Sequence, residues 1–267
     1  MHDDLEKLRA AASSRPGDPV ARARLAEALA GAGDPEAEES ARKAAQLART
    51  CLEVGIAAPA HEAATLLYGA FRDDPLATEV AILLADATVA RAGEDDVAEA
   101  RRMLEAIVER HPDALEARLR AAALALGLGD AGAARGWVEP VAAQTTQTRT
   151  LYVQALLALG ALDEAAAEAR AGVAALAASG DDRAESVLHQ LLGVAELTRG
   201  DVTAAIDAFA EGVRLGPEDP IAYYNLALAF EASGSAAAAL GVCDAGLELA
   251  PTDARLLALK GRLATTA

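Results

Sequence analysis

Two short strings in this sequence have residue types and spacings that could do chemistry. The first, residues 61–65, reads HEAAT. In a helical H-E-x-x-H motif, two histidines four residues apart bind zinc and the glutamate acts as a general base. Thr65 stands where the second histidine would have to be. We therefore expect His61 and Glu62 to open a helix and to bind no metal.

The second string is rich in glycine. Residues 127–132 read GLGDAG, which matches the G-x-G-x-x-G pattern of dinucleotide-binding turns. That turn needs a strand before it and a helix after it, because the helix N-terminus binds the pyrophosphate. The residues before Gly127 have the spacing of a helix instead. We expect a turn between two helices here.

Other catalytic patterns are absent from the sequence. No serine lies in a G-x-S-x-G string, and none of the three lysines (Lys7, Lys43, Lys260) lies in a phosphate-binding loop motif. The acidic pairs at 73–74, 95–96 and 181–182 are most simply helix caps and solvated turns. The order of residues alone does not exclude a triad assembled from distant segments. We predict no catalytic residue, no metal site, no cofactor and no enzyme activity.

Composition favours helices and excludes several classes of partner. Of 267 residues, 72 are alanine and only 3% are aromatic, which favours helices over a β-sandwich or barrel. The net charge of −17 repels phosphate backbones and anionic lipid, so we expect no nucleic-acid or membrane partner. The chain has only two cysteines, opens on the acidic stretch MHDDLE and has no long apolar run. These features predict a cytoplasmic protein.

Apolar residues recur every three or four positions, and glycine, proline and aspartate interrupt this pattern at regular distances. The pattern predicts fifteen short antiparallel helices. They cover residues 2–14, 19–32, 36–56, 60–72, 77–92, 96–110, 114–128, 131–143, 147–159, 162–178, 183–198, 202–215, 219–233, 236–249 and 253–264.

The helices repeat with a period of 34 residues. Segments 186–219 and 220–253 align without a gap, so that Gly200 matches Gly234 and Pro217 matches Pro251. An alanine followed twelve residues later by a proline occurs four times, as Ala63/Pro75, Ala100/Pro112, Ala205/Pro217 and Ala239/Pro251. Because proline is rare in this chain, this agreement indicates a true internal repeat.

These residues resemble the tetratricopeptide repeat family. The resemblance is strongest in residues 222–230, which read AYYNLALAF, and continues through Gly234, Ala239 and Pro251. It implies an all-α fold, a right-handed α-α superhelix (solenoid) of about six to seven helical hairpins with a C-terminal capping helix. In that cap, Leu256, Leu257, Leu259 and Leu263 would face the stack.

The resemblance also suggests a division of the chain. We expect degenerate helical repeats over 1–74, the regular solenoid over 75–253, and the capping helix and tail over 254–267. Pro140 should kink or end its helix, since proline removes a helical hydrogen bond. One hypothesis is that the superhelix bends near 136–148; the alternative is a merely degenerate repeat.

In this family the first helix of each hairpin lines a concave groove that binds a peptide or a partner helix. The corresponding positions in the two best repeats are Val187, Gln190, Val194, Leu197, Ile221, Tyr224, Leu228 and Glu231. They suit an apolar peptide or amphipathic helix. The alternative is that they pack against neighbouring helices or the cap. The equivalent N-terminal positions, Glu79, Asp86 and Glu116, are acidic and would favour a basic partner segment.

The sequence thus predicts a non-catalytic scaffold or adaptor that binds a protein or peptide partner in the groove. One alternative is a structural module in which a second copy of the chain occupies the groove or an end face, giving a homo-oligomer. Another is a peptide-sensing regulator, although residues 1–60 show no basic helix-turn-helix.

Overall fold

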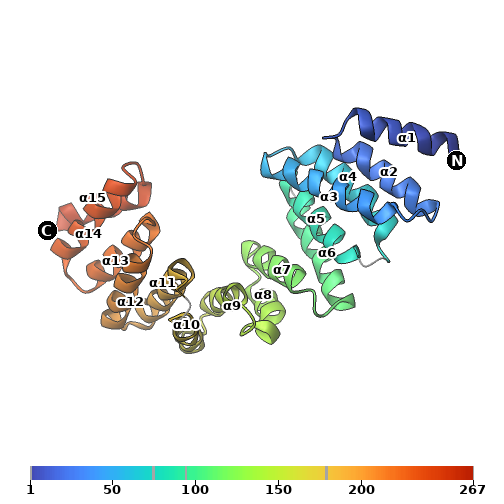
Figure 1. Cartoon of the computed structure of the whole chain (residues 1–267). Coiled ribbons are helices and arrows are strands. Elements are labelled where there is room, and N and C mark those ends of the chain that lie inside the picture. The colour runs from blue at the N-terminus through green and yellow to red at the C-terminus, as the bar shows by residue number, and fades with distance from the viewer. Residues whose placement is uncertain (1, 74–75, 94, 178–179, 267) are drawn as a thin grey trace. The chain divides into compact units, whose positions relative to one another are not determined.

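The computed structural model describes residues 2–73, 76–93, 95–177 and 180–266 (Figure 1). These residues form α-helices and one short 3-10 helix, with no strand among them. The chain divides into two compact units, Met1–Gly129 and Asp130–Ala267. The boundary predicted at residue 74 lies outside the described residues and stays a prediction.

The described residues of the first unit form seven helices, and each packs against the next along the chain. They are α1 (His2–Ser14), α2 (Pro19–Gly31), α3 (Ala37–Glu53), α4 (Ala57–Phe71), α5 (Ala77–Ala90), α6 (Asp96–Arg110) and α7 (Leu115–Gly127).

In the second unit each element likewise packs against the next along the chain. Its elements are α8 (Ala131–Val138), η1 (Glu139–Val141), α9 (Thr146–Ala158), α10 (Leu162–Leu176), α11 (Asp182–Arg199), α12 (Val202–Leu215), α13 (Pro220–Ala232), α14 (Ala236–Leu249) and α15 (Ala254–Thr266). The fifteen predicted helices are confirmed, most with ends within two residues of those expected.

Small residues allow the helices of a pair to lie close together. A Cβ atom built on Gly193 of α11 would lie 2.5 Å from the ring of Phe209 on α12, so no larger residue fits without a shift. Ala227, one period later, is completely buried beside Cys243 of α14. All four alanines of the alanine–proline pattern are likewise completely buried. The alanine-rich sequence therefore builds the core as well as the helices.

Glycine and aspartate make the turns between paired helices. Gly33, Gly129, Gly160, Gly200 and Gly234 each have φ between 67° and 89°, the left-handed region in which glycine carries no Cβ penalty. Aspartate side chains then accept hydrogen bonds from backbone N–H groups in the first turn of α2, α8, α11, α12 and α13.

The helix expected over 131–143 is shorter than predicted. α8 ends at Val138, and the chain continues as the 3-10 helix η1, which contains Pro140. Proline has no backbone N–H to donate to the carbonyl four residues earlier, so the α-helical pattern stops there. The predicted effect of Pro140 is confirmed locally, whereas the bend of the superhelix stays a hypothesis.

In α15, Leu256, Leu259 and Leu263 are buried as expected of a capping helix, but Leu257 is 48% exposed. The expectation for Leu257 was wrong, because it lies one position from Leu256 and points about 100° away around the helix. No helix in the part of the chain that the structure describes is both long and apolar enough to cross a lipid bilayer.

Candidate functional site

The eight predicted groove residues lie on α11 and α13. Capping hydrogen bonds stabilise the N-terminus of each helix, and a hydrogen bond between two side chains joins the helices. The Asp181 carboxylate accepts a hydrogen bond from the Ala184 N–H at 3.1 Å, and Asp219 accepts one from the Ile221 N–H at 2.9 Å. Between the two helices, the Asn225 amide donates to the Gln190 side-chain oxygen at 3.0 Å. Equivalent helices of successive repeats are thus joined directly.

The eight predicted groove residues differ in exposure. Val187 and Ile221 are 41% and 45% exposed, while the other six are half-buried. These two occupy equivalent positions, 34 residues apart, near the starts of α11 and α13. On α11, Val194 and Leu197 pack against the buried cluster that contains Phe209.

On α13, Tyr224 and Glu231 contact α15, and Leu228 packs against the buried cluster that α15 shares. Tyr224 and Leu228 pack against the cluster that includes Leu256, Leu259 and Leu263. The Arg255 guanidinium lies 5.8 Å from the centre of the Tyr224 ring, within cation–π distance. Arg262 donates two hydrogen bonds to the Glu231 carboxylate, at 2.7 and 2.9 Å, and lowers the pKa of that group. The alternative given in the sequence analysis, in which groove positions pack against neighbouring helices or the cap, therefore fits Tyr224, Leu228 and Glu231.

A cavity of about 690 Å³ adjoins the exposed end of this surface. Its walls are the first turns of α11 and the segment from the end of α12 to the start of α13. The lining residues are Arg183, Ser186, Val187, Leu215, Gly216, Pro217, Glu218, Asp219 and Pro220. Of the predicted site residues, only Val187 lines it, and Ile221 follows directly after Pro220. The helical spacing of the sequence contained no signal for this cavity.

The acidic N-terminal positions have their own partners. The Glu79 carboxylate pairs with Arg49 at 3.0 Å. Arg120 lies 3.2 Å from Asp86 and 3.1 Å from Glu116. Burial raises the pKa of Asp86, although Arg120 opposes this effect. Arginines of the chain itself therefore compensate much of the negative charge that was expected to favour a basic partner.

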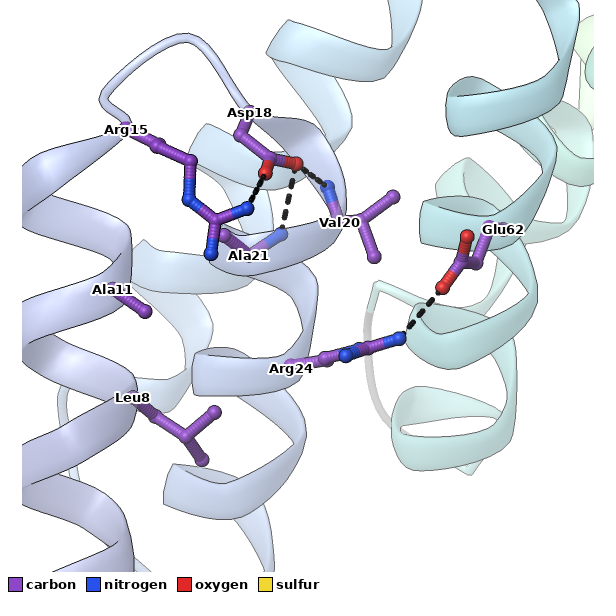
Figure 2. Close-up of a pocket in the computed structure, with 8 residues that line it drawn as sticks. All are labelled: Leu8, Ala11, Arg15, Asp18, Val20, Ala21, Arg24 and Glu62. Atoms are coloured by element: carbon purple, nitrogen blue, oxygen red, sulfur yellow. Dashed lines mark hydrogen bonds and ion pairs between the residues drawn. The ribbon is translucent and has the colours of Figure 1, made fainter.

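A second cavity, of about 350 Å³, lies in the first unit between α1, α2 and α4 (Figure 2). Leu8, Ala11, Val20 and Ala21 form its apolar lining. The charged side chains at its edge are paired, Arg15 with Asp18 at 3.2 Å and Arg24 with Glu62 at 2.8 Å, as Figure 2 shows. These pairs leave no free charge there to select a ligand.

The two chemical strings of the sequence lie in ordinary helical positions. His61 and Glu62 are in the second turn of α4, and the Thr65 hydroxyl donates to the His61 carbonyl at 2.8 Å. Gly129 and Asp130 connect α7 to α8, and Asp130 accepts a hydrogen bond from the Ala133 N–H. The described residues contain no group of three or more His, Cys, Asp or Glu arranged to hold a metal ion.

Comparison with known proteins supports the repeat interpretation. The tetratricopeptide repeat family matches residues 89–147 and 191–254. No curated protein matches the sequence.

Several solved structures share the fold at low sequence identity. A tetratricopeptide repeat protein from Parabacteroides merdae is 15% identical with a TM-score of 0.67, over 83% of this chain and 84% of that one. YrrB, a tetratricopeptide repeat protein described as having an unusual peptide-binding site, is 17% identical with a TM-score of 0.52, over 75% and 99%. TTC0263 from Thermus thermophilus is 20% identical with a TM-score of 0.53, over 70% and 97%.

The helix pairs, the buried small residues, the period of 34 and these matches lead to one conclusion. Residues 89–147 and 191–254 match the tetratricopeptide repeat family, and the fold of the chain is similar to that of solved tetratricopeptide repeat proteins.

Proposed function

We propose that this chain is a non-catalytic scaffold whose second unit binds an apolar peptide or helix of a partner protein near the N-terminal ends of α11 and α13. Tetratricopeptide repeat solenoids in general serve protein–protein interaction. Stacked helices hold such a surface in place before the partner arrives, which lowers the entropy cost of binding.

The exposure of Val187 and Ile221 is the observation that carries this proposal. Both are large aliphatic side chains, they recur one period apart, and each has more than two fifths of its surface open to solvent. Val187 also lines the 690 Å³ cavity, which gives room for a partner side chain. Burial of apolar surface is the main favourable contribution to such an association.

The other groove positions have a supporting role in this proposal. Tyr224 and Glu231 contact α15, and Leu228 packs against the buried cluster that α13, α14 and α15 share. YrrB, which shares the fold, is described as binding a peptide, and this description is consistent with a peptide as the ligand class here.

The test is selection of a phage-displayed random peptide library on the full chain. We expect enriched peptides rich in apolar residues, and we expect Val187→Asp and Ile221→Asp to weaken their binding at least about tenfold, since each variant places an unpaired charge against an apolar ligand. Leu159→Asp is the matched control, because Leu159 is also exposed, at 46%, and lies outside this surface.

Two outcomes would contradict the proposal. In the first, no peptide is enriched. In the second, the enriched peptides bind all three variants as well as the wild-type chain. Light scattering of the wild-type chain over a range of concentrations tests the self-association alternative, which would be favoured by a mass that rises with concentration and falls in Val187→Asp.

A further inference from the structure

The segment between α12 and α13 forms one wall of the cavity beside Val187, and its backbone is held in place. Pro217 and Pro220 each fix one backbone dihedral angle of this short segment. The Tyr223 hydroxyl of α13 donates a hydrogen bond to the Pro217 carbonyl at 3.1 Å. The backbone that carries Glu218, which lies between the two prolines, is therefore ordered before any partner binds.

The fold does not account for the charge of Glu218. Its side chain is exposed, lines the cavity, and has no hydrogen bond or ion pair with another residue that the structure describes. One period later, Thr252 stands at the same position of the turn between α14 and α15, so this kind of turn needs no carboxylate there. Asp219 differs, because it caps α13 as Asp253 caps α15 one period later.

The charges in and around the cavity are mostly negative. Among the described residues, its lining holds the carboxylates of Glu218 and Asp219 and one cation, Arg183. Asp182 and Glu185 lie in the same helical turn as Arg183 and offset its charge. A segment that approaches the cavity therefore meets a negative potential, which attracts a cation and repels a carboxylate.

Apolar side chains flank Glu218 in two successive repeats. Val187 and Leu215, which we call the first apolar pair, both line the cavity. The residues 34 positions later, Ile221 and Leu249, form the second apolar pair and are 45% and 47% exposed. Glu218 lies three residues after Leu215 and three before Ile221 in the sequence, so the carboxylate stands between the two pairs.

We infer that the partner segment is basic as well as apolar. One of its Lys or Arg side chains pairs with Glu218, and apolar side chains before and after that residue contact the first and second apolar pairs. This inference rests on the proposed function and adds the class of partner. The apolar contacts supply most of the affinity, since an exposed ion pair contributes little, while the charge selects basic over acidic segments.

The test uses the peptides that the phage-displayed library yields on the wild-type full chain. We expect them to carry Lys or Arg among apolar residues. Glu218→Lys should weaken their binding about threefold to tenfold, and peptides whose Lys or Arg is changed to Glu should bind Glu218→Lys more tightly than wild type. This variant should fold normally, because the position is exposed and the equivalent Thr252 carries no charge. Leu249→Ala should also weaken binding about threefold to tenfold.

Two control variants separate this site from the acidic character of the whole chain, which attracts basic peptides by itself. Glu109→Lys changes the net charge by the same amount at an exposed position of α6, in the first unit, and should leave the affinity unchanged. Leu159→Ala shortens a leucine that is also exposed, at 46%, and lies outside this surface.

Several outcomes would overturn this inference and leave the proposed function standing. They are enriched apolar peptides without Lys or Arg, enriched acidic peptides, equal effects of Glu218→Lys and Glu109→Lys, or an effect of Leu249→Ala no larger than that of Leu159→Ala. Failure to enrich any peptide would overturn both.

Discussion

Among single residues, Glu196 in α11 has the most demanding environment. It is 1% exposed, and it accepts hydrogen bonds from Arg170 of α10 and, at 2.8 Å, from Arg199 of its own helix. Arg199 also lies 2.9 Å from Asp163 of α10. A buried carboxylate is tolerated only when such partners replace the water that it loses. Glu196 therefore ties α10 to α11.

We predict that Glu196→Ala lowers the free energy of unfolding by about 1.5–3 kcal/mol, the usual range for hydrogen bonds to charged groups. Glu211→Ala removes a pair between exposed side chains, with Arg214, and should cost less than about 1 kcal/mol. Urea unfolding of both variants measures the difference. Equal losses in the free energy of unfolding would mean that the buried hydrogen bonds of Glu196 stabilise the fold no more than an exposed ion pair does.

Ala92 is the one described residue other than glycine with a positive φ, at 57°. It follows α5, in a turn of the kind where the other helix pairs have glycine. An L-residue in the left-handed region has its Cβ too close to a carbonyl oxygen.

Ala92→Gly should therefore raise the free energy of unfolding by about 0.5–1 kcal/mol, while Gly234→Ala, where φ is 78°, should lower it by about 1 kcal/mol. Thermal melting of the two variants beside the wild type gives the signs. A loss of stability in Ala92→Gly would contradict the strain argument.

Titration provides a test of the environment of His189. Burial lowers its pKa, an effect that Glu185 on α11 and Glu211 on α12 oppose and that Arg214 on α12 reinforces. Because the folded state takes up its proton at lower pH than the unfolded state does, His189 contributes stability above about pH 6.5 that is lost as the pH falls.

As the pH falls from about 8 to about 5.5, a range that spans the usual histidine pKa of about 6.5, the wild-type chain should lose stability more steeply than His189→Gln. The midpoint of urea unfolding at each pH measures this loss. Comparing slopes removes any constant effect of the substitution on packing. Parallel curves for the two proteins would show that burial does not disfavour the charged form of His189.

At the scale of the elements, the distance between paired helices is decided by a few small residues. Gly193 faces the Phe209 ring, whereas Gly241, also in a helix interior, has no atom within 4 Å of where its Cβ would be. The same residue type therefore has opposite roles in α11 and α14. At Gly193 it makes room for a neighbouring helix, and at Gly241 it only weakens its own helix.

One substitution made at both positions should have opposite effects. Gly193→Ala should lower the free energy of unfolding by about 1–3 kcal/mol through overpacking against Phe209. Gly241→Ala should raise it by up to about 1 kcal/mol, because alanine has the higher helix propensity. The double variant Gly193→Ala/Phe209→Leu should recover part of the first loss. Urea unfolding of the three variants checks this, and equal signs at 193 and 241 would contradict it.

At the scale of the whole molecule, the chain consists of two compact units, each with its own buried clusters. The first unit buries mainly alanine and leucine from α1 to α5 in one cluster. The second buries Phe209, Cys243 and the three leucines of α15. In repeat proteins each helix pair contacts only its neighbours, so a part that retains its own core can fold alone.

We therefore expect the fragment 130–267, which begins at the capping residue of α8, to be helical and to unfold cooperatively. Circular dichroism during thermal unfolding measures both properties. If the proposed function is correct, the fragment also retains the affinity of the full chain for the selected peptides. An unstructured fragment would show that the second unit depends on the first for its stability.

The sequence by itself determined the helices, their turns and their repetition. Apolar spacing, glycine and aspartate act within a few residues of one another, so the fifteen helices and the effect of Pro140 were predictable. The period of 34 also followed from the sequence, because Gly200 and Gly234, and Pro217 and Pro251, recur one period apart.

Only the tertiary structure decided which side chains meet. Glu231 contacts Arg262, which lies 31 residues later in the sequence, and Asp86 contacts Arg120, which lies 34 residues later. Likewise, the cavity beside Val187 is lined by two segments that are separate in the sequence. Such contacts depend on how far each helix is rotated and shifted against its neighbour. Local spacing places a residue on a helix face, but packing of the whole stack determines whether that face is open or covered.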